Sequence, residues 1–283
     1  MKEVKNDVLQ KMQMSMELKG FAKSTMKTYL AHIKRFSVFC DKPLDQCSYD
    51  DIRNYLYDAI HNRKLSGMFV DSSYSAIVFM FRYVFKRKWD MQEVPRLKRK
   101  VFLPSILDRD EVLSIINSTQ NLKHKAALST AYSAGLRVSE VAHLKVSDID
   151  SSNMRIIVKQ GKGGKDRHTL LSKNNLTILR NYYREYKPSS WLFPGQIPDD
   201  HLSVRTFQKV FKDAVKRVGI EKNVSFHTLR HCFATHMLNN GANIIAIKNL
   251  LGHGSIDTTC KYLHLTHSQV LGVKSPFDDG GDI

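Results

Sequence analysis

Apolar residues recur every three or four positions along most of this 283-residue chain, as they do on one face of an α-helix. In the first third of the chain no stretch alternates in the manner of a strand. Ser24 is placed to cap one helix, and Ser48 with Asp51 gives the capping-box pattern of another. A later apolar run predicts a helix over 72–88. We therefore expect residues 1–91 to fold as a compact all-helical domain.

Two prolines then interrupt the helical pattern. Proline disfavours helix at its own position and at the preceding one, so Pro95 and Pro104 predict an extended linker over 92–105. The basic residues of this segment are Arg96, Lys98, Arg99 and Lys100. Such a run fits either a solvated charged segment or a linker that lies along DNA phosphates, and the sequence leaves both interpretations open.

One glycine-rich segment has the pattern of a hairpin. Residues 154–159 are β-branched and extended, three glycines lie between 161 and 164, and 167–171 resemble a returning strand. Lys162 falls at the tip of this hairpin. The predicted fold class is therefore mainly α with a small antiparallel β-sheet.

Helical patterns surround the hairpin. Asp108 and Glu111 form a second capping-box pattern, and a helix over 122–134 is expected to end at Gly135. Further helices are expected at about 173–187, 203–218, 226–240, 243–251 and 256–263. We assign residues 106–264 to a second domain and 265–283 to a C-terminal tail.

Charge and composition narrow the class of partner and the compartment. The formal charge of +17 favours a polyanionic partner, most simply nucleic acid. Four cysteines without CxxC spacing fit reduced thiols in a cytosolic protein. The most apolar stretch, 76–85, is too short to span a bilayer. We expect a soluble, cytoplasmic and nucleoid-associated protein.

A set of basic side chains and one tyrosine occurs in fixed order through the second domain. These residues are Arg137, Lys162, His227, Arg230, His253 and Tyr262. An arginine fork can contact two phosphate oxygens at once, and such contacts strengthen as the phosphorus becomes five-coordinate. Because no carboxylate cluster is present to hold a metal, side chains must supply the positive charge. The set predicts DNA strand cleavage and rejoining, with Tyr262 as a plausible nucleophile.

The neighbours of these residues suggest supporting roles and two alternatives that we reject. Glu140 follows Arg137 by three positions on a helix and could orient its guanidinium group. The glycine turn around Lys162 lacks the spacing and the Ser or Thr of a P-loop. A zinc site at His227, His231 and His236 lacks the general-base Glu of metalloproteases, since Thr228 stands in its place, so no metal is expected.

Taken together, the motifs resemble those of the tyrosine recombinase family, also called phage-type integrases, with Xer-like and mobile-element integrases closest in organisation. The motifs are Gly135-Leu136-Arg137-Val138-Ser139-Glu140, Gly161-Lys162-Gly163, His227-Thr228-Leu229-Arg230-His231, Leu250-Leu251-Gly252-His253 and Tyr262. The resemblance covers nearly the whole chain. It implies a helical core-binding domain, a basic linker and a catalytic domain.

The resemblance also implies a mechanism. Tyr262 would attack the scissile phosphorus and form a 3′-phosphotyrosine, while Lys162 would protonate the departing 5′-oxygen. Transition-state stabilisation would come from Arg137, Arg230 and His253, proton transfer at Tyr262 would be assisted by His227, and Glu140 would support the site. Double-stranded DNA would be contacted by Arg96, Lys98, Arg99, Lys100, Lys165 and Arg205. No ATP or other cofactor is implied, and the expected assembly is a tetramer on two paired sites. Residues 265–277 are expected to dock on a neighbouring subunit, the alternative being a tail folded back on its own domain.

Two other functions remain open from the sequence. A type IB topoisomerase would use the same chemistry to nick one strand without pairing two sites. A sequence-specific DNA-binding protein would retain the fold with a catalytically silent site. The complete set of site residues argues against the second alternative, and the two-domain layout argues against the first.

Overall fold

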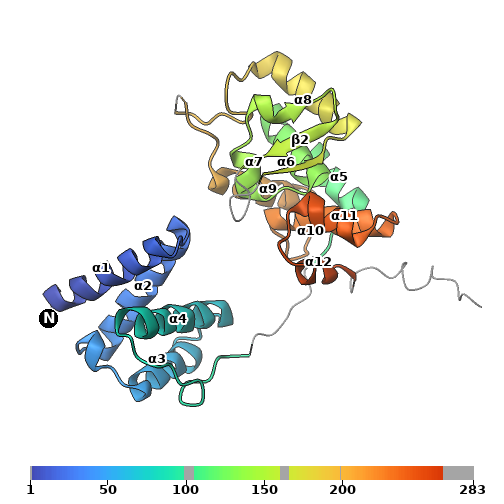
Figure 1. Ribbon diagram of the computed structural model, residues 1–283. Helices are drawn as coiled ribbons and strands as arrows, with labels where there is room; N and C mark the ends of the chain where they lie inside the picture. The colour runs from blue at the N-terminus through green and yellow to red at the C-terminus, as the bar shows by residue number, and fades with distance from the viewer. Residues whose placement is uncertain (1, 99–104, 160–165, 198, 264–283) are drawn as a thin grey trace, which may run out of the picture. The chain divides into compact units, whose positions relative to one another are not determined.

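The computed structural model describes residues 2–98, 105–159, 166–197 and 199–263 (Figure 1). The chain divides into two compact units, residues 1–101 and 102–283. Both are built mainly from helices, and the second also holds a small antiparallel sheet, which confirms the predicted fold class. None of the described helices is both long enough and apolar enough to cross a membrane.

The regular elements of the N-terminal unit, over its described residues 2–98, are all helical. Its elements are α1 (Lys2–Leu18), α2 (Lys23–Cys40), a 3₁₀ turn (Leu44–Gln46), α3 (Tyr49–His61), α4 (Gly67–Phe79) and a π-helical turn (Met80–Val84). Helix α4 packs against both α2 and α3, and α1 packs against α2 and the π-helical turn. The apolar faces of these elements enclose one core, as the helical periodicity predicts.

The N-terminal ends of the helices in this unit can be compared with the caps expected from the sequence. The capping box of Ser48 and Asp51 is confirmed at the start of α3. The cap at Ser24 was wrong, since α2 begins one residue earlier and Ala22 precedes it without a side-chain cap. The helix expected over 72–88 also begins earlier, because Ser66 accepts a hydrogen bond from the Phe69 amide and caps α4. After Phe79 the expected helix continues as the π-helical turn, which ends at Val84.

Hydrogen bonds of two aromatic side chains hold residues 89–94, which follow the π-helical turn, against this core. The Trp89 indole N–H donates to the Tyr74 hydroxyl at 3.0 Å, and that hydroxyl donates to the Val94 carbonyl at 3.2 Å. The Val94 side chain is itself buried. The segment expected to be a linker over 92–105 is therefore held against the N-terminal unit at its beginning.

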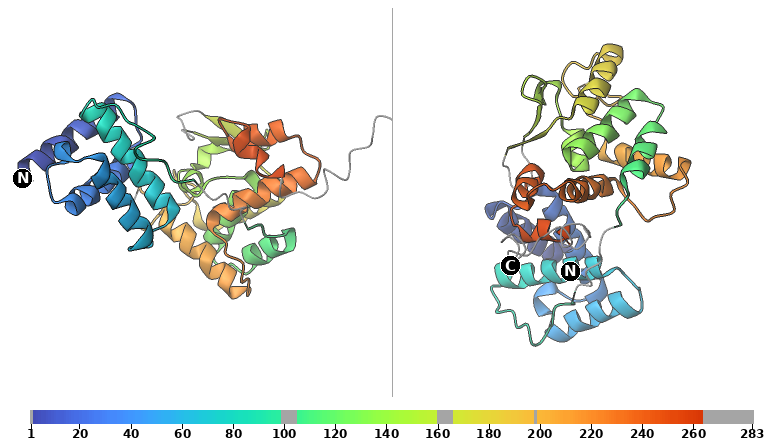
Figure 2. Two further views of the ribbon diagram at one scale, coloured as in Figure 1. Left: turned by 90° about the horizontal axis from the view of Figure 1, so that it is seen from below. Right: turned by 90° about the vertical axis from the view of Figure 1, so that its right-hand side faces the viewer.

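The second unit surrounds a central helix, α6 (Leu122–Ala134). The other elements are α5 (Arg109–Asn117), α7 (Val138–Ala142), a 3₁₀ turn (Val146–Asp148), β1 (Ile149–Asp150), β2 (Arg155–Val158), β3 (Arg167–Leu170), α8 (Lys173–Tyr186), α9 (Val204–Arg217), α10 (Phe226–Asn239), α11 (Ile244–Leu251) and α12 (Asp257–Cys260). Helix α6 packs against α5, α7, α8, α9 and α10 (Figures 1 and 2). The capping box of Asp108 and Glu111 is confirmed at α5.

The sheet of this unit has the antiparallel order β1-β2-β3. Strands β2 and β3 are the predicted hairpin, and Ile156 pairs with Thr169 in their register. The short strand β1 was not expected, because two residues are too few to show alternation. The tip of the hairpin, with Lys162 and Lys165, lies outside the described residues.

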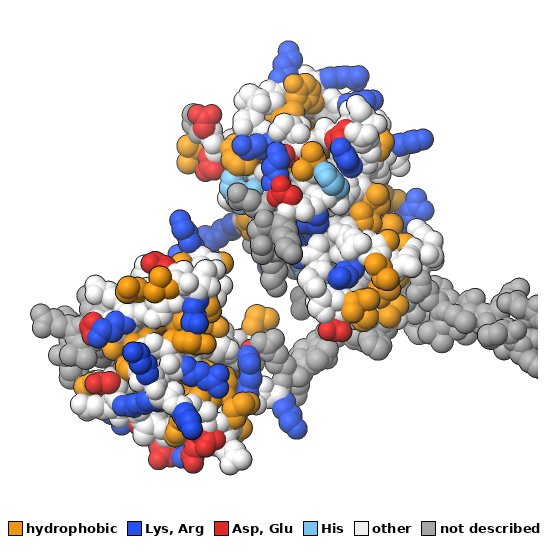
Figure 3. All heavy atoms as spheres, in the orientation of Figure 1, with side chains coloured by type: hydrophobic (Ala, Val, Ile, Leu, Met, Phe, Trp, Pro, Cys, Tyr) orange, Lys and Arg blue, Asp and Glu red, His pale blue; other side chains and the backbone are white. Residues whose placement is uncertain are grey.

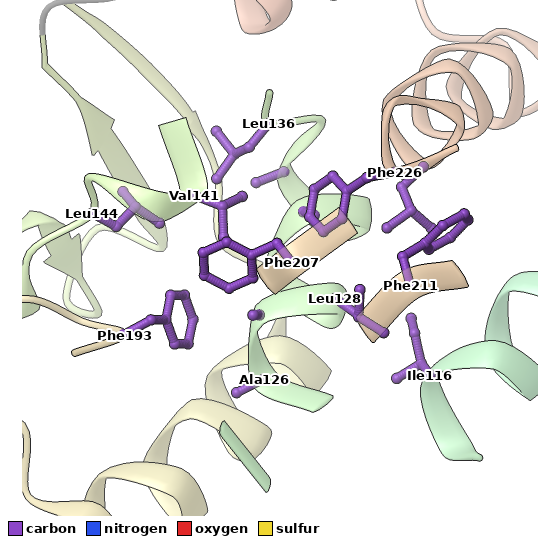
Figure 4. Close-up of a cluster of buried hydrophobic side chains, with 14 of the residues drawn as sticks. Ile116, Ala126, Leu128, Leu136, Val141, Leu144, Phe193, Phe207, Phe211 and Phe226 are labelled. Carbon is purple, nitrogen blue, oxygen red and sulfur yellow. The ribbon is translucent and has the colours of Figure 1, made fainter. Parts of the chain in front are cut away.

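Phenylalanine side chains from three segments fill the centre of the second unit. Phe207 and Phe211 from α9 meet Phe226 from α10 and Phe193 from the preceding loop (Figure 4). Alanines on α6, such as Ala126, allow these rings to approach the central helix closely.

On the outside, Lys and Arg side chains are spread over the visible faces of both units (Figure 3).

Candidate active site

The end of the central helix α6 begins the site. Gly135 terminates α6 with a positive φ of 62°, a conformation that glycine adopts without strain. A Cβ atom here would lie 2.4 Å from a ring carbon of Phe233, so the position also has no room for a larger residue. Arg137 follows two residues later at the start of α7, which fixes its backbone against the end of α6.

Glu140 connects two arginines beneath the site. Its carboxylate accepts hydrogen bonds from the Arg137 backbone N–H at 2.8 Å and from the Arg137 guanidinium at 2.6 Å. Arg167 on β3 donates to both carboxylate oxygens, each at 2.8 Å, and its Nε donates to the Leu250 carbonyl. Burial alone would raise the pKa of Glu140, but the hydrogen bonds and positive charge of Arg167, then of Arg137, outweigh it and lower the pKa to about 2.

Arg230 is buried and held by main-chain carbonyls. Only 1% of its surface is exposed, and its two terminal nitrogens donate to the carbonyls of Gly135 at 2.8 Å and Leu251 at 2.7 Å. Glu140 lies 3.7 Å from the same guanidinium. Burial, followed by the charge of Arg137, lowers the Arg230 pKa to about 10, so the group stays positively charged at neutral pH. The Arg230 guanidinium group is therefore held in one orientation.

A cleft of about 570 Å³ opens above these arginines. Its lining consists of Arg137, His227, Arg230, Gly252, His253, Gly254, Ser255, Thr258, Lys261 and Tyr262. Five of the six predicted catalytic residues thus share one cleft, although they come from three separate regions of the chain. The sixth, Lys162, lies outside the described residues.

Tyr262 follows α12 and has 1% of its surface exposed. Its hydroxyl lies 2.9 Å from Nδ1 of His231, within hydrogen-bonding distance. The ring of His253 stacks nearly parallel to the tyrosine ring, with 6.5 Å between centres. Burial raises the pKa of Tyr262 to about 12, against the opposing charges of Arg230 and Arg137. The phenol is therefore protonated in the free protein.

The two predicted catalytic histidines are uncharged at neutral pH. Burial, and then the charge of Arg230, lowers the pKa of His227 to about 4 and that of His253 to about 3. His253 Nδ1 lies 2.8 Å from the Thr259 hydroxyl, which orients the ring. In the free protein these imidazoles are hydrogen-bonding groups, and the positive charge of the described cleft comes from arginine and lysine.

The residues predicted to contact DNA are distributed over both units. Arg99, Lys100 and Lys165 lie outside the described residues. Lys98 and Arg205 are exposed, and neither lines the cleft. Arg96 donates to Asp71 at 2.6 Å and to the Ser75 hydroxyl at 3.1 Å, so it already has partners within the N-terminal unit.

Three contributors were missing from the predicted set. Arg167 has no local signal, because its partner Glu140 is 27 residues away. Lys261 lines the cleft, and its amine lies 5.2 Å from the Tyr262 ring centre. His231 follows Arg230 directly, and its sequence pattern suggests only the rejected zinc site. Within the described part of the chain, no group of three or more His, Cys, Asp or Glu residues could hold a metal ion.

Two family models match the chain. The model of the phage integrase family matches residues 105–269, and that of the phage integrase N-terminal SAM-like domain matches 8–91. The chain belongs to the phage integrase family. Its family membership confirms the resemblance inferred from the motifs, and the chain is a tyrosine-type site-specific recombinase.

Individual relatives are similar over most of their length. A putative integrase/recombinase of Sinorhizobium fredii is 37% identical over 270 residues, which cover 95% of this chain and 88% of the relative. Tyrosine recombinase XerA of Pyrococcus horikoshii is 34% identical over 269 residues, with coverage of 93% and 90%.

Solved structures extend the comparison to the fold. A XerA recombinase crystal structure is 28% identical with a TM-score of 0.55, and the match covers 94% of this chain and 96% of that one. A lambda integrase tetramer bound to a Holliday junction has a TM-score of 0.75 at 21% identity, with coverage of 91% and 76%. The second likeness concerns the fold alone.

Proposed function

We propose that this recombinase cleaves and rejoins double-stranded DNA through a 3′-phosphotyrosine formed by Tyr262. The observation that carries the proposal is the shared cleft, in which Tyr262 lies with two arginines and two histidines. The bond energy of the cleaved strand is kept in the tyrosyl ester, so rejoining requires no ATP. The recombinase would use this chemistry in DNA integration, excision or resolution.

The cleft residues have separate roles in the proposed reaction. Arg137 and Arg230 bind the non-bridging oxygens of the scissile phosphate, and His253 donates a hydrogen bond as negative charge develops there. Because Arg230 is already oriented by two carbonyls, little reorganisation is needed when the phosphate arrives. Lys162 protonates the leaving 5′-oxygen, and His227 assists proton transfer at Tyr262. Glu140 supports the arginines.

The DNA partner and the assembly are also proposals. The formal charge of +17 suits a DNA-binding surface, for which we assign Lys98, Arg99, Lys100, Lys165 and Arg205, with a smaller share for Arg96. Related structures include XerH bound to difH substrate and a lambda integrase tetramer bound to a Holliday junction. By analogy, we propose a homotetramer on two paired sites and a cytoplasmic, nucleoid-associated location.

The C-terminal tail is proposed to link the subunits of this tetramer. Residues 265–277 lie outside the described residues, and their apolar group is too small to form a core. Deletion of 265–283 should weaken complexes that pair two sites while one subunit still binds a half-site. Recombination by the truncated protein at the normal rate would contradict docking in trans.

A nicked suicide substrate tests the proposed function directly. When the short 5′ fragment diffuses away after cleavage, the covalent protein–DNA product is trapped and migrates slowly in a denaturing gel. We expect such a product in excess EDTA, because side chains supply the charge neutralisation that metals supply elsewhere. Relaxation of supercoils without a defined site would favour a topoisomerase, and binding without a covalent product would favour a catalytically silent DNA-binding protein.

A further inference from the structure

His231 has a direct contact with the proposed nucleophile. Its Nδ1 atom lies 2.9 Å from the Tyr262 hydroxyl oxygen, and the two ring centres are 5.6 Å apart. A general base must lie within about 2.6–3.2 Å of the group whose proton it removes. His231 satisfies this requirement before any DNA is bound.

The position of His231 is fixed by the helix that carries it. It follows Arg230 in α10, and Arg230 is held by the carbonyls at the ends of α6 and α11. One turn earlier on the same helix, His227 packs edge to face against the His231 ring, with 4.7 Å between centres at 89°. The imidazole is therefore placed relative to both the phosphate-binding arginine and the tyrosine.

The charged surroundings keep His231 in the form that accepts a proton. The groups that face it are His227 and Arg230 on α10, together with Lys261, Tyr262 and His253 from the segment after α11. Burial first, and then His227, Lys261, Arg230 and His253, lower the pKa of His231 to about 3. A phosphodiester bound at Arg230 offsets this positive field, so the imidazole becomes more basic when the substrate is in place.

We propose that His231 is the catalytic base that removes the proton from the Tyr262 hydroxyl during strand cleavage. The assignment rests on the proposed function. The phenolic proton moves to the Nδ1 lone pair, with the other ring proton on Nε2. The phenolic oxygen forms a bond to phosphorus, the bond from phosphorus to the 5′-oxygen breaks, and the leaving oxygen takes a proton from Lys162. In rejoining, His231 returns its proton to Tyr262.

This assignment gives His227 an indirect part in the proton transfer. The tyrosine hydroxyl lies within hydrogen-bonding distance of His231, whereas His227 packs edge to face against the His231 ring. His227 therefore assists by positioning His231 and remains available to the phosphate from the cleft.

The test compares His231→Asn with wild type in single-turnover cleavage of the suicide substrate. Asparagine places a hydrogen-bonding group near the position of Nδ1 but cannot take up the proton. We expect a loss on the order of 10²–10⁴ in cleavage rate at neutral pH, with half-site binding retained as the check on folding. His231→Gln provides a second variant of the same kind.

The pH dependence separates a base from a packing residue. Without its base, the variant relies on hydroxide to ionise Tyr262, whose pKa is about 12. The ratio of wild-type to variant rates should therefore fall by roughly tenfold per pH unit above neutrality. A ratio that is the same at every pH would overturn the proposal. If the ratio falls for His227→Asn instead, His227 is the base.

A sulfur-substituted substrate identifies the end of the reaction at which His231 acts. A 5′-bridging phosphorothiolate leaves as a thiolate, which needs no proton. It should rescue Lys162→Ala and leave the defect of His231→Asn unchanged, whereas rescue of His231→Asn would overturn the assignment. Covalent trapping by Tyr262→Phe would refute the proposed function. Loss of trapping in Tyr262→Phe together with near-normal cleavage by His231→Asn would refute only the inference.

Discussion

Arg96 in the N-terminal unit and Arg230 in the catalytic unit both lie close to a buried carboxylate, but they differ in access to solvent. The Arg96 side chain is 47% exposed beside Asp71, whereas that of Arg230 is 1% exposed near Glu140. An exposed guanidinium can contact water or a phosphate while it keeps its partner, whereas a buried one is restricted to the groups that enclose it. The comparison indicates an adaptable charge at Arg96 and a fixed charge at Arg230.

The physical origin of this difference is the kind of acceptor that each arginine uses. Arg96 binds two side chains, those of Asp71 and Ser75. Arg230 binds main-chain carbonyls that helix ends hold in place. Fixed charge suits a reaction in which a phosphate must be held within a fraction of an ångström. Adaptable charge suits binding along a DNA backbone.

The largest expected effect concerns the tyrosine that the fixed charges surround. Tyr262→Phe should abolish the covalent protein–DNA product and retain DNA binding, because the hydroxyl is the nucleophile and the arginines are unchanged. The measurement is trapping on the suicide substrate. Tyr183→Phe, at a half-exposed tyrosine on α8, is the control and should trap normally. Trapping by the Tyr262 variant would mean that another residue is the nucleophile.

Replacement of the fixed arginines by lysine should have the next largest effect. Arg137→Lys and Arg230→Lys keep the positive charge but lose the bidentate hydrogen bonding of the guanidinium group. Loss of one oxyanion donor costs on the order of 10²–10³ in rate. Single-turnover cleavage at saturating DNA measures this loss. Arg217→Lys is a matched control, since Arg217 also donates to a carbonyl, that of Ser118, but lies on the surface. Near-normal cleavage by the site variants would remove the distinction between the units.

The carboxylate beneath the arginines should matter for stability. Glu140→Gln leaves buried arginine charge without its partner and should lower the free energy of unfolding at pH 7 by about 3 kcal/mol. Because the folded pKa of Glu140 is about 2 and its ordinary value is 4.5, its contribution is complete above pH 4.5 and is lost as the pH falls towards 2.

Thermal unfolding of the two proteins across this pH range measures the contribution of Glu140. The wild type should lose its advantage over Glu140→Gln as the solution is acidified. Asp150→Asn is the control, because the pKa of Asp150 is also about 2 but hydrogen bonds from Asn153 and Arg155 at the surface lower it. Equal destabilisation by both substitutions would contradict the special role of burial.

The smallest effect is expected from the adaptable charges. Neutralising Arg96, Lys98, Arg99 and Lys100 together should flatten the salt dependence of DNA binding by up to about 0.9 log unit for each phosphate contacted. Arg96→Gln alone should change the slope less than Lys98→Gln, because the Arg96 guanidinium is paired with Asp71. An unchanged slope in the fourfold variant would identify this run as a solvated charged segment.

Local sequence signals predicted the parts of this structure that depend on neighbouring residues. The capping boxes at Ser48 and Asp108, the end of α6 at Gly135 and the hairpin strands each depend on a few adjacent side chains. The π-helical turn after α4 and the two-residue strand β1 have no such signal, since tertiary packing determines both.

The candidate site was predictable in its composition and not in its contacts. The order of Arg137, Arg230 and Tyr262 could be read from motifs. The contact of Arg167 with Glu140 joins residues from different elements, and sequence spacing cannot reveal it. The contact of His231 with the Tyr262 hydroxyl spans 31 residues and depends on how α10 and the segment after α12 meet.

The use of main-chain acceptors for Arg230 has a consequence for how this site can diverge over evolutionary time. Every residue type carries a carbonyl, so a substitution at the position of Leu251 changes the side chain and leaves the acceptor in place. Gly135 is different, because its backbone conformation and its closeness to Phe233 exclude larger residues. Mutational drift can therefore alter much of the shell around the arginine, provided that the path of the backbone through Gly135 is preserved.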